Sequence, residues 1–179
     1  MDAGADDLLT GLLPRISQLS GVLSRGRLDE HAMAEAGLSL ERPAMSLLVT
    51  LRMAGGPLRV GEIATRMQVV GPHVTRQING LEKRGLVRRV ADPDDQRARL
   101  IEPTPEGAEA TDRYLAVVLG WLSGAMAGWS EQDRQDFGRL LGRFADDLTA
   151  RVAGLDAAEQ AAGQAADSCL LNRFGRGKR

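Results

Sequence analysis

The chain has 179 residues, of which 43% are hydrophobic, so it is long enough for one domain with a sizeable core or for a small domain joined to an extended helical part. Lys and Arg total 23 against 24 Asp and Glu, so no overall basic field indicates a nucleic-acid partner, and such a function has to rest on a local patch. The single cysteine, Cys169, excludes an internal disulfide framework and a CxxC metal site.

Export and membrane insertion are not expected. Asp2, Asp6 and Asp7 lie where a signal peptide needs basic residues, and no uninterrupted apolar stretch approaches the roughly 20 residues that span a bilayer. The lone cysteine also suits a reducing compartment. We therefore expect a cytoplasmic protein without a membrane partner.

Catalytic groups are scarce in the sequence. There are only two histidines, His31 and His73, with one late cysteine, no metal-ligand spacing and no glycine-rich loop that could cradle a phosphate. We expect no enzyme activity and therefore no catalytic residues, no metal site and no cofactor.

Two helices are predicted in the first third of the chain. The first carries one apolar stripe, and Pro14 either kinks it or places its start near Leu13. The second is predicted over residues 40–54, with Ser39 as a candidate N-cap and Pro43 tolerated in the first turn. The stripe of the first helix consists of Leu8, Leu12, Ile16, Leu19 and Leu23.

A short helix over residues 60–67 and a longer one over residues 72–84, joined by a tight break, predict a helix-turn-helix. Pro72 at the first helical position, after Gly71 as N-cap, marks the start of the longer helix. Gly85 sits where a left-handed C-terminal cap is needed. These boundaries are unusually well marked by the residues themselves.

Two strands are predicted next, over residues 86–90 and 98–101, around the polar, turn-rich segment 92–96. This pattern predicts a β-hairpin, the wing of a winged helix.

Two further helices are predicted after the wing. Thr104, Pro105 and Glu106 supply an N-cap, a first-position proline and a first-turn acid for a long helix, and Ser130 with Asp133 can form a capping box for the next one. Their apolar stripes consist of Leu115, Val118, Leu119, Leu122 and Met126, and of Phe137, Leu140, Leu141, Phe144 and Leu148. Both stripes need a partner surface.

The longer helix of the predicted helix-turn-helix has an apolar face and a polar face. Val74, Ile78 and Leu81 recur at helical spacing and are predicted to face the core. A face of donors suits the major groove of DNA, where arginine bonds guanine with two hydrogen bonds and threonine or histidine bonds bases or phosphates. The residues turned outward are His73, Thr75, Arg76, Asn79 and Gly80. On an isolated helix the same side chains would more often be ordinary solvated residues.

The wing changes that balance in favour of DNA. A guanidinium at the predicted tip, Arg97, could enter the narrow minor groove beside the helix. Asp95 is expected either to orient Arg97 or to cap the turn through backbone N–H groups. The basic and amide side chains gathered in this hairpin are Arg88, Arg89, Gln96, Arg97 and Arg99.

The order and spacing of several short runs closely resemble the multiple-antibiotic-resistance regulator (MarR) family, over roughly residues 8–152. The runs are Val60-Gly61-Glu62-Ile63-Ala64, Val74-Thr75-Arg76, Leu81-Glu82-Lys83-Arg84-Gly85-Leu86-Val87, Asp92-Pro93-Asp94-Asp95-Gln96-Arg97-Ala98 and Thr104-Pro105-Glu106-Gly107. The resemblance implies a homodimer with interlocking terminal helices, two winged helices on a palindromic double-stranded operator, and a small-molecule pocket between the dimerisation and DNA-binding parts.

Carried over by position, the resemblance makes a set of residues candidate DNA contacts. They are Pro72, His73, Thr75 and Arg76 on the recognition helix and Arg97 at the wing tip. Asn79 on the outward face of the helix, and Gln96 and Arg99 in the wing, are further candidate contacts, with Asp95 orienting the wing. Members of the family usually carry Ser or Thr at Gly71 and Arg at Gln96, so one phosphate or cap contact and one wing charge are expected to be missing here. The Ser or Thr expected to cap the preceding helix is Arg59, which could donate to a phosphate instead. Cys169 is far from the N-terminal helix that carries the reactive cysteine of peroxide-sensing members.

The expected fold is mainly α with a small β-hairpin wing, a winged helix-turn-helix domain plus a helical dimerisation domain built from both termini. The expected parts are an N-terminal dimerisation helix (1–36), the DNA-binding region (37–103), C-terminal dimerisation helices (104–153) and a weakly packed tail (154–179).

The expected function is that of a dimeric, nucleoid-associated repressor released from its operator by a phenolic or anionic effector. The candidate effector pocket contains His31, Met45, Leu48 and Trp121, although His31 could be a structural histidine and Trp121 part of a dimer core. The alternative function is a winged helix that binds another protein and no DNA, since fold does not dictate function.

Overall fold

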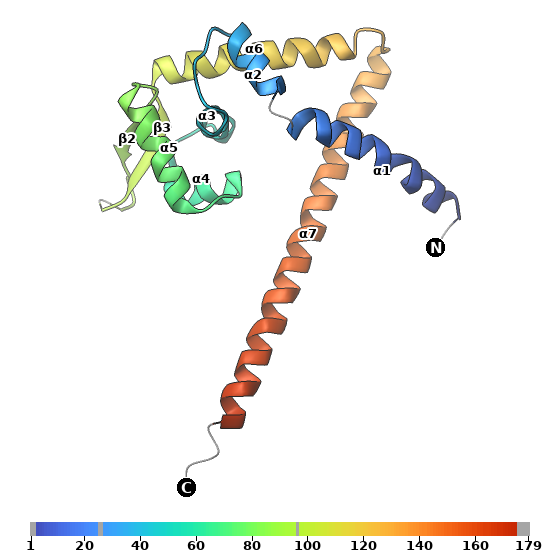
Figure 1. The fold of residues 1–179 in the computed structure, drawn as a ribbon, viewed down its shortest axis with the longest axis vertical. Coiled ribbons are helices and arrows are strands. Elements are labelled where there is room, and N and C mark those ends of the chain that lie inside the picture. Colours follow the sequence, from blue (N-terminus) through green and yellow to red (C-terminus); the bar gives the residue numbers. More distant parts are fainter. Residues whose placement is uncertain (1–2, 25–26, 96, 175–179) are drawn as a thin grey trace. The chain divides into compact units, whose positions relative to one another are not determined.

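The structure is a computed structural model that describes residues 3–24, 27–95 and 97–174, and the side chains of residues 10–22, 28–95 and 97–155. It divides into two compact units, Met1–Gly124 and Ala125–Arg179. The described elements follow in the order α1 (Ala3–Ser24), α2 (Arg27–Glu35), α3 (Arg42–Ala54), β1 (Leu58–Arg59), α4 (Val60–Met67), α5 (Gly71–Lys83), β2 (Val87–Ala91), β3 (Arg99–Pro103), α6 (Pro105–Ala125) and α7 (Glu131–Phe174) (Figure 1). The predicted class, helical with a small wing, is confirmed.

The core of the first unit lies where α3, α4 and α5 pack together and against the sheet. The predicted inward residues of α5, Val74, Ile78 and Leu81, are all buried. The sheet has three antiparallel strands in the order β1-β3-β2, with Val87 opposite Pro103. Sequence analysis predicted the hairpin of β2 and β3 and missed β1, because a two-residue strand has no periodicity to detect.

The recognition helix α5 begins at Gly71, one residue before the predicted start, after an extended Val70. It ends at Lys83, one residue before the predicted end, and the predicted left-handed glycine follows at Gly85. Gly85 has φ +71°, its N–H donates to Glu82 O over 3.0 Å, and the N–H of Leu86 donates to Leu81 O over 3.0 Å. This pair of bonds is a Schellman motif, for which glycine is favoured because a side chain would strain the left-handed backbone.

Helix α6 is joined tightly to the end of α5. Thr104 donates from its backbone N–H to Leu86 O over 3.0 Å and from its hydroxyl to Gly85 O over 2.6 Å. The Thr104 hydroxyl oxygen also accepts the N–H of Gly107 over 3.1 Å, as the predicted N-cap should. A Cβ at Gly107 would lie 1.9 Å from Leu86 O, so only glycine allows this approach.

Three N-terminal expectations need correction. Helix α1 runs from Ala3 with Pro14 inside it, so a start near Leu13 is wrong. Helix α3 begins at Arg42 with Glu41, not Ser39, as N-cap, because Pro43 fits a first turn that starts this late. Within residues 1–36, expected to hold one dimerisation helix, the structure has a second helix, α2, whose nine residues include too few apolar ones to produce a clear stripe.

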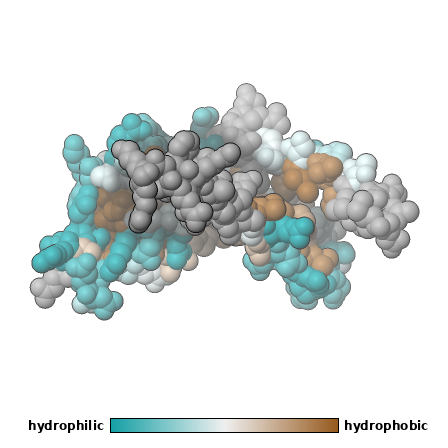
Figure 2. All heavy atoms as spheres, turned by 90° about the horizontal axis from the view of Figure 1, so that it is seen from below, coloured by the Kyte–Doolittle hydropathy of each residue, from teal (hydrophilic) through white to brown (hydrophobic). Residues whose placement is uncertain are grey.

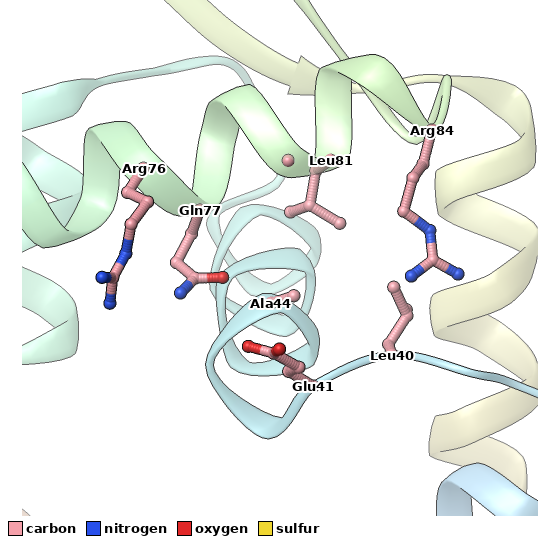
Figure 3. A pocket seen from close by; sticks show the side chains of 8 residues that line it. Leu40, Glu41, Ala44, Arg76, Gln77, Leu81 and Arg84 are labelled. Atoms are coloured by element: carbon pink, nitrogen blue, oxygen red, sulfur yellow. The ribbon is translucent and has the colours of Figure 1, made fainter.

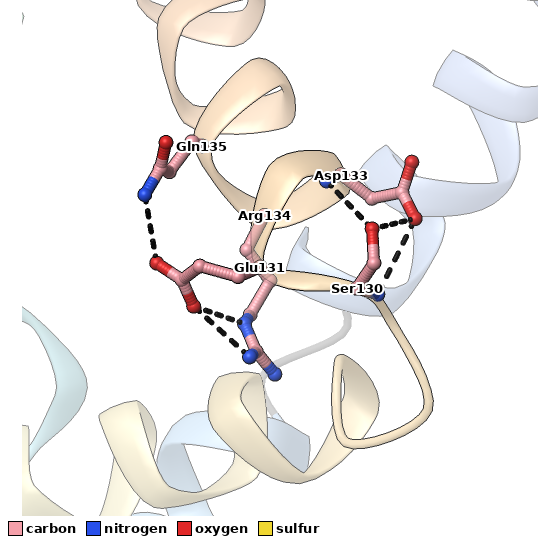
Figure 4. Close-up of polar contacts among 5 residues, drawn as sticks. All are labelled: Ser130, Glu131, Asp133, Arg134 and Gln135. Atoms are coloured by element: carbon pink, nitrogen blue, oxygen red, sulfur yellow. Dashed lines mark hydrogen bonds and ion pairs between the residues drawn. The ribbon is translucent and has the colours of Figure 1, made fainter.

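The second unit contains helix α7, whose start is the predicted capping box. The N–H of Asp133 donates to the Ser130 hydroxyl over 3.1 Å, and the Ser130 N–H donates to Asp133 Oδ2 over 3.3 Å (Figure 4). In the same first turn Glu131 pairs with Arg134 (Figure 4). The helix then continues to Phe174, through the segment expected to be a weakly packed tail, because its alanine-rich composition has no proline to end a helix.

Among the described residues, no helix is both long and apolar enough to cross a membrane. Within the same residues, no cluster of three or more His, Cys, Asp or Glu is arranged to hold a metal ion.

Candidate nucleic-acid interface

The outward face of α5 carries the polar side chains that sequence analysis singled out. Pro72, Thr75, Arg76 and Asn79 are exposed and His73 is half-buried. Arg76 Nη2 lies 3.4 Å from His73 Nδ1, one helical turn away. The Thr75 hydroxyl donates to Gly71 O over 3.1 Å, so toward a ligand its oxygen can act as an acceptor.

Asn79 links α5 to the sheet. Its Oδ1 accepts a hydrogen bond from Arg89 Nη2 over 2.8 Å, and Arg89 Nε also pairs with Glu82 Oε2 at 3.2 Å. The side-chain oxygen of Asn79 therefore accepts a hydrogen bond within the protein. The N–H groups of its side-chain amide are the part available to a base. Arg88 pairs with Glu102 across the strands at 2.6 Å, so both arginines of the incoming strand bond to protein carboxylates.

The wing tip presents Arg97, which is exposed. Among the described residues, none accepts a hydrogen bond from its guanidinium. Of the two roles considered for Asp95, the structure contains the turn cap, since Asp95 Oδ1 accepts the backbone N–H of Arg97 over 2.9 Å. Arg99 donates to Ala98 O over 3.0 Å, and Gln96 lies outside the described residues.

A hollow of about 510 Å³ lies beside α5, between this helix and the start of α3. In Figure 3, Arg76 and Arg84 lie at its two ends, and Glu41 lies across from them on the α3 side. Arg84 was not singled out from the sequence, since the C-cap position alone does not reveal which way its side chain points. It extends the cationic edge of α5 beyond Arg76.

Sequence analysis also missed an ion pair at the base of the wing. Asp92, only 4% exposed, lies 2.6 Å from Arg59 Nη2 and accepts a hydrogen bond from Arg59 Nε over 2.7 Å. From the sequence, the only role expected for Arg59 is donation to a phosphate. The two residues are 33 positions apart, so their contact could be found only from the fold.

A second hollow, of about 390 Å³, lies between α2, α3 and α6. Of the four predicted pocket residues, Met45 lines it, whereas Leu48 is fully buried in the core and His31 is exposed on α2. Trp121 is half-buried and packs against the core cluster without lining this hollow. The lining residues are Asp29, Arg42, Met45, Ser46, Val49, Thr50, Tyr114, Leu115 and Val118.

Three of these residues form a polar chain on the wall of the hollow. Tyr114 donates its hydroxyl to Asp29 Oδ1 over 2.8 Å, and Arg42 Nε lies 2.7 Å from Asp29 Oδ2. Burial, and then the Asp29 carboxylate, raise the pKa of Tyr114 to about 12. The phenol is therefore a hydrogen-bond donor at every physiological pH.

Tyr114 is the only tyrosine of the chain, so its titration can be followed directly by tyrosinate absorbance. We expect the native protein to titrate near pH 12 instead of 10.0, and the phenol's contribution to stability to be lost as pH rises from about 10 to about 12. Asp29→Asn should lower the midpoint, which should stay above 10.0 because burial persists. A wild-type midpoint near 10 would contradict the contact.

Known proteins match both the sequence and this geometry. The sequence profile of the MarR family matches residues 40–98. YetL of Bacillus subtilis (strain 168), named an HTH-type transcriptional repressor, is 27% identical over 149 residues, 83% of this chain and 85% of YetL. YxaD of the same organism, named an uncharacterized HTH-type transcriptional regulator, is 32% identical over 106 residues, 59% of this chain and 73% of YxaD. The chain belongs to the MarR family.

The fold agrees with this membership. A MarR family protein from Bacillus stearothermophilus superposes with a TM-score of 0.66 at 22% identity, covering 83% of this chain and 99% of that one. The chain is thus a MarR-family helix-turn-helix transcriptional regulator and not an enzyme. The matched residues 40–98 include α5 and the wing tip, so the two surfaces described above lie in the part that defines the family.

Proposed function

We propose that the chain is a dimeric, sequence-specific DNA-binding repressor whose operator binding is relieved by a small-molecule effector. One observation carries the DNA-binding part. The exposed polar face of α5 and the exposed Arg97 belong to a single unit, with the sheet and α5 packed on one core. A surface of this kind reads two adjacent grooves with fixed spacing between the contacts.

In this proposal the start of α5 enters the major groove. Arg76 would bond a guanine edge and Thr75 a base or phosphate. Pro72 and His73 would lie beside the DNA backbone, where the positive end of the helix dipole favours a phosphate. Asn79 would contribute through its amide N–H groups. Arg97 would enter the minor groove, with Arg99 as a second candidate contact on the wing.

The dimer is proposed from the apolar stripes of the helices. On α7, Phe144 is 47% exposed and Leu148 51%. Figure 2 shows hydrophobic side chains among hydrophilic ones on the face of the molecule in view. The second unit contains no other described helix that could cover this stripe. A stripe with this spacing is stabilised by a second copy of the same helix, and a two-fold dimer would bind a palindrome. Further exposed apolar residues are Leu12, Leu13, Ile16, Leu19 and Val22 on α1, and Leu119 and Leu122 on α6.

Repression and effector release rest on similarity and on one hollow. YetL is named a repressor. The hollow lined by Met45, Asp29 and Tyr114 has an apolar wall and a donor–acceptor chain, which suits a small aromatic ligand. Because the Asp29 carboxylate already neutralises the charge of Arg42, the hollow should bind a phenol more tightly than an anion. Phenol should therefore release bound DNA at a lower concentration than benzoate does. The reverse order of the two compounds would exclude this hollow as the effector site. A regulator of this kind would act at the nucleoid, in the cytoplasm.

A protein-binding winged helix is the second candidate. Apolar residues would then be expected on the outer face of α5, whereas Thr75, Arg76 and Asn79 lie there. Absence of any binding to duplex DNA would favour that candidate.

Arg76→Ala tests the proposal directly. On a duplex that the wild-type protein enriches from a random-sequence pool, the variant should lose roughly 1–3 kcal/mol, about 5- to 150-fold in affinity, if a base is read. On unselected duplex the loss should be much smaller. Arg143→Ala removes the same charge from an exposed position of α7 and should leave both affinities unchanged. Equal losses of Arg76→Ala on both duplexes would assign Arg76 to phosphate contact and reject base reading.

A further inference from the structure

The carboxylate of Asp92, at the base of the wing, is buried and contacts both a guanidinium and a backbone N–H group. Asp92 and Thr111 are the only buried polar residues among the side chains that the structure describes. Asp92 Oδ2 accepts a hydrogen bond from Arg59 Nε over 2.7 Å and lies 2.6 Å from Arg59 Nη2. Asp92 Oδ1 accepts the backbone N–H of Asp94 over 2.9 Å. The Asp94 N–H, and then Arg59, hold the pKa of Asp92 below its usual range, so it is ionised at neutral pH.

Each end of this pair is anchored in a different part of the winged helix. Arg59 ends β1 and is the N-cap of α4, where its backbone N–H donates to Glu62 Oε2 over 2.7 Å. Asp92 is the first residue after β2. The pair therefore ties the start of α4 to the point where the wing turn leaves the sheet.

The turn beyond Asp92 is built from short-range hydrogen bonds that start at Asp92 itself. The Asp94 N–H is bonded to Asp92, and Asp95 then accepts the N–H groups of Arg97 at its side chain and of Ala98 at its backbone oxygen, both over 2.9 Å. An exposed turn at the end of a two-stranded hairpin has little packing to order it. Removing the charge that holds its first residue should release the whole tip.

We propose that Arg59 and Asp92 form a positioning pair that holds the wing turn in the conformation in which Arg97 meets the minor groove. The inference rests on the proposed DNA-binding function, because it assigns the pair a role only through Arg97. It also gives a role to Arg59, at the position where the family usually has Ser or Thr. The pair itself contacts no DNA group. It orders the wing tip before binding, so that less conformational entropy is lost when the tip meets DNA.

A double-mutant cycle tests the pair on the enriched duplex. Arg97→Ala alone should weaken DNA binding about tenfold. It should also reduce the slope of log affinity against log salt concentration by about one charge per subunit. Asp92→Asn should do nearly the same, and the double variant should bind no more weakly than either single one, because Arg97 already fails to engage. Losses that multiply in the double variant would overturn the inference.

Two controls separate positioning from folding. Glu102→Gln breaks the Arg88–Glu102 pair, a strand ion pair of similar length, and the Arg97→Ala loss should keep its full size in that background. Arg59→Lys keeps the charge beside Asp92 and should retain most of the affinity. If Arg97→Ala has no effect in the wild type, the proposed wing contact and this inference both fail.

A second measurement uses the free protein. Hydrogen exchange at the backbone amides of Asp94 and Arg97 should become faster in Asp92→Asn. The backbone amide of Ile78, a core residue of α5, should keep its protection. Unchanged exchange at both wing amides would overturn the positioning role even if DNA binding itself is established. Loss of protection at Ile78 as well would make the pair a determinant of overall folding and would equally overturn it.

Discussion

Gly107→Ala is expected to destabilise the folded protein by about 3 kcal/mol or more, the upper end of the range for overpacking. The added Cβ would lie 1.9 Å from Leu86 O and 2.9 Å from Leu86 C, so it would meet backbone and no flexible side chain could move aside. Leu86 is itself held by the Schellman bond to Leu81 and by the N–H of Thr104. The strand start and helix α6 would therefore have to separate.

Urea unfolding measures this effect. Gly120→Ala is the matched control on the same helix, because nothing lies within 4 Å of a Cβ there, and it should leave the stability unchanged or raise it by up to ~1 kcal/mol. Equal stability of the Gly107→Ala and wild-type proteins would show that the joint between α5 and α6 is looser than described. A measurable loss of DNA affinity in a folded Gly107→Ala protein is also expected, since this joint orients α5 relative to α6.

Phe144→Asp is expected to convert the dimer to monomer and to lower the affinity for a two-site operator by on the order of 100-fold or more, because linked binding of two half-sites is lost. A carboxylate in the centre of an apolar stripe would have to be buried unpaired against the second copy. Phe144 is 47% exposed in the single chain, so its replacement should cost the protomer's own core little. Sedimentation and operator titration measure the two effects.

Ala153→Asp introduces the same charge on α7 on the side away from the Phe144 stripe, where the residue is exposed. It should change neither the sedimentation nor the affinity. A Phe144→Asp protein that remains dimeric would place the interface elsewhere, and one that becomes monomeric yet keeps its operator affinity would separate DNA binding from dimerisation.

Helix α5 and several helix caps were predictable because interactions between residues close in sequence determine them. Pro72 and Gly85 mark the ends of α5, and the left-handed backbone at Gly85 has few alternatives to glycine. The spacing of Val74, Ile78 and Leu81 alone selects which side chains of α5 face outward. Likewise Thr104 and Ser130 are predictable as caps, since a cap bonds to N–H groups within three residues of itself.

Contacts between distant residues could not be predicted in the same way. Arg59 with Asp92 and Tyr114 with Asp29 join positions 33 and 85 residues apart, and any of the many arginines could have paired with either acid. For the same reason the effector pocket was predicted around His31 and Trp121, while the hollow is formed by side chains of α2, α3 and α6. The extent of α7 was missed because alanine-rich, weakly patterned sequence is compatible with both helix and tail.

The central claim is that a dimer of this chain reads DNA sequence with α5 and the wing. Selection of bound duplexes from a random-sequence pool tests it most directly. The proposal predicts enrichment of an inverted repeat whose half-site centres lie about one helical turn apart, ~34 Å, and loss of that enrichment in Arg76→Ala. A pool that stays random after repeated selection, although the protein is folded, would contradict the claim.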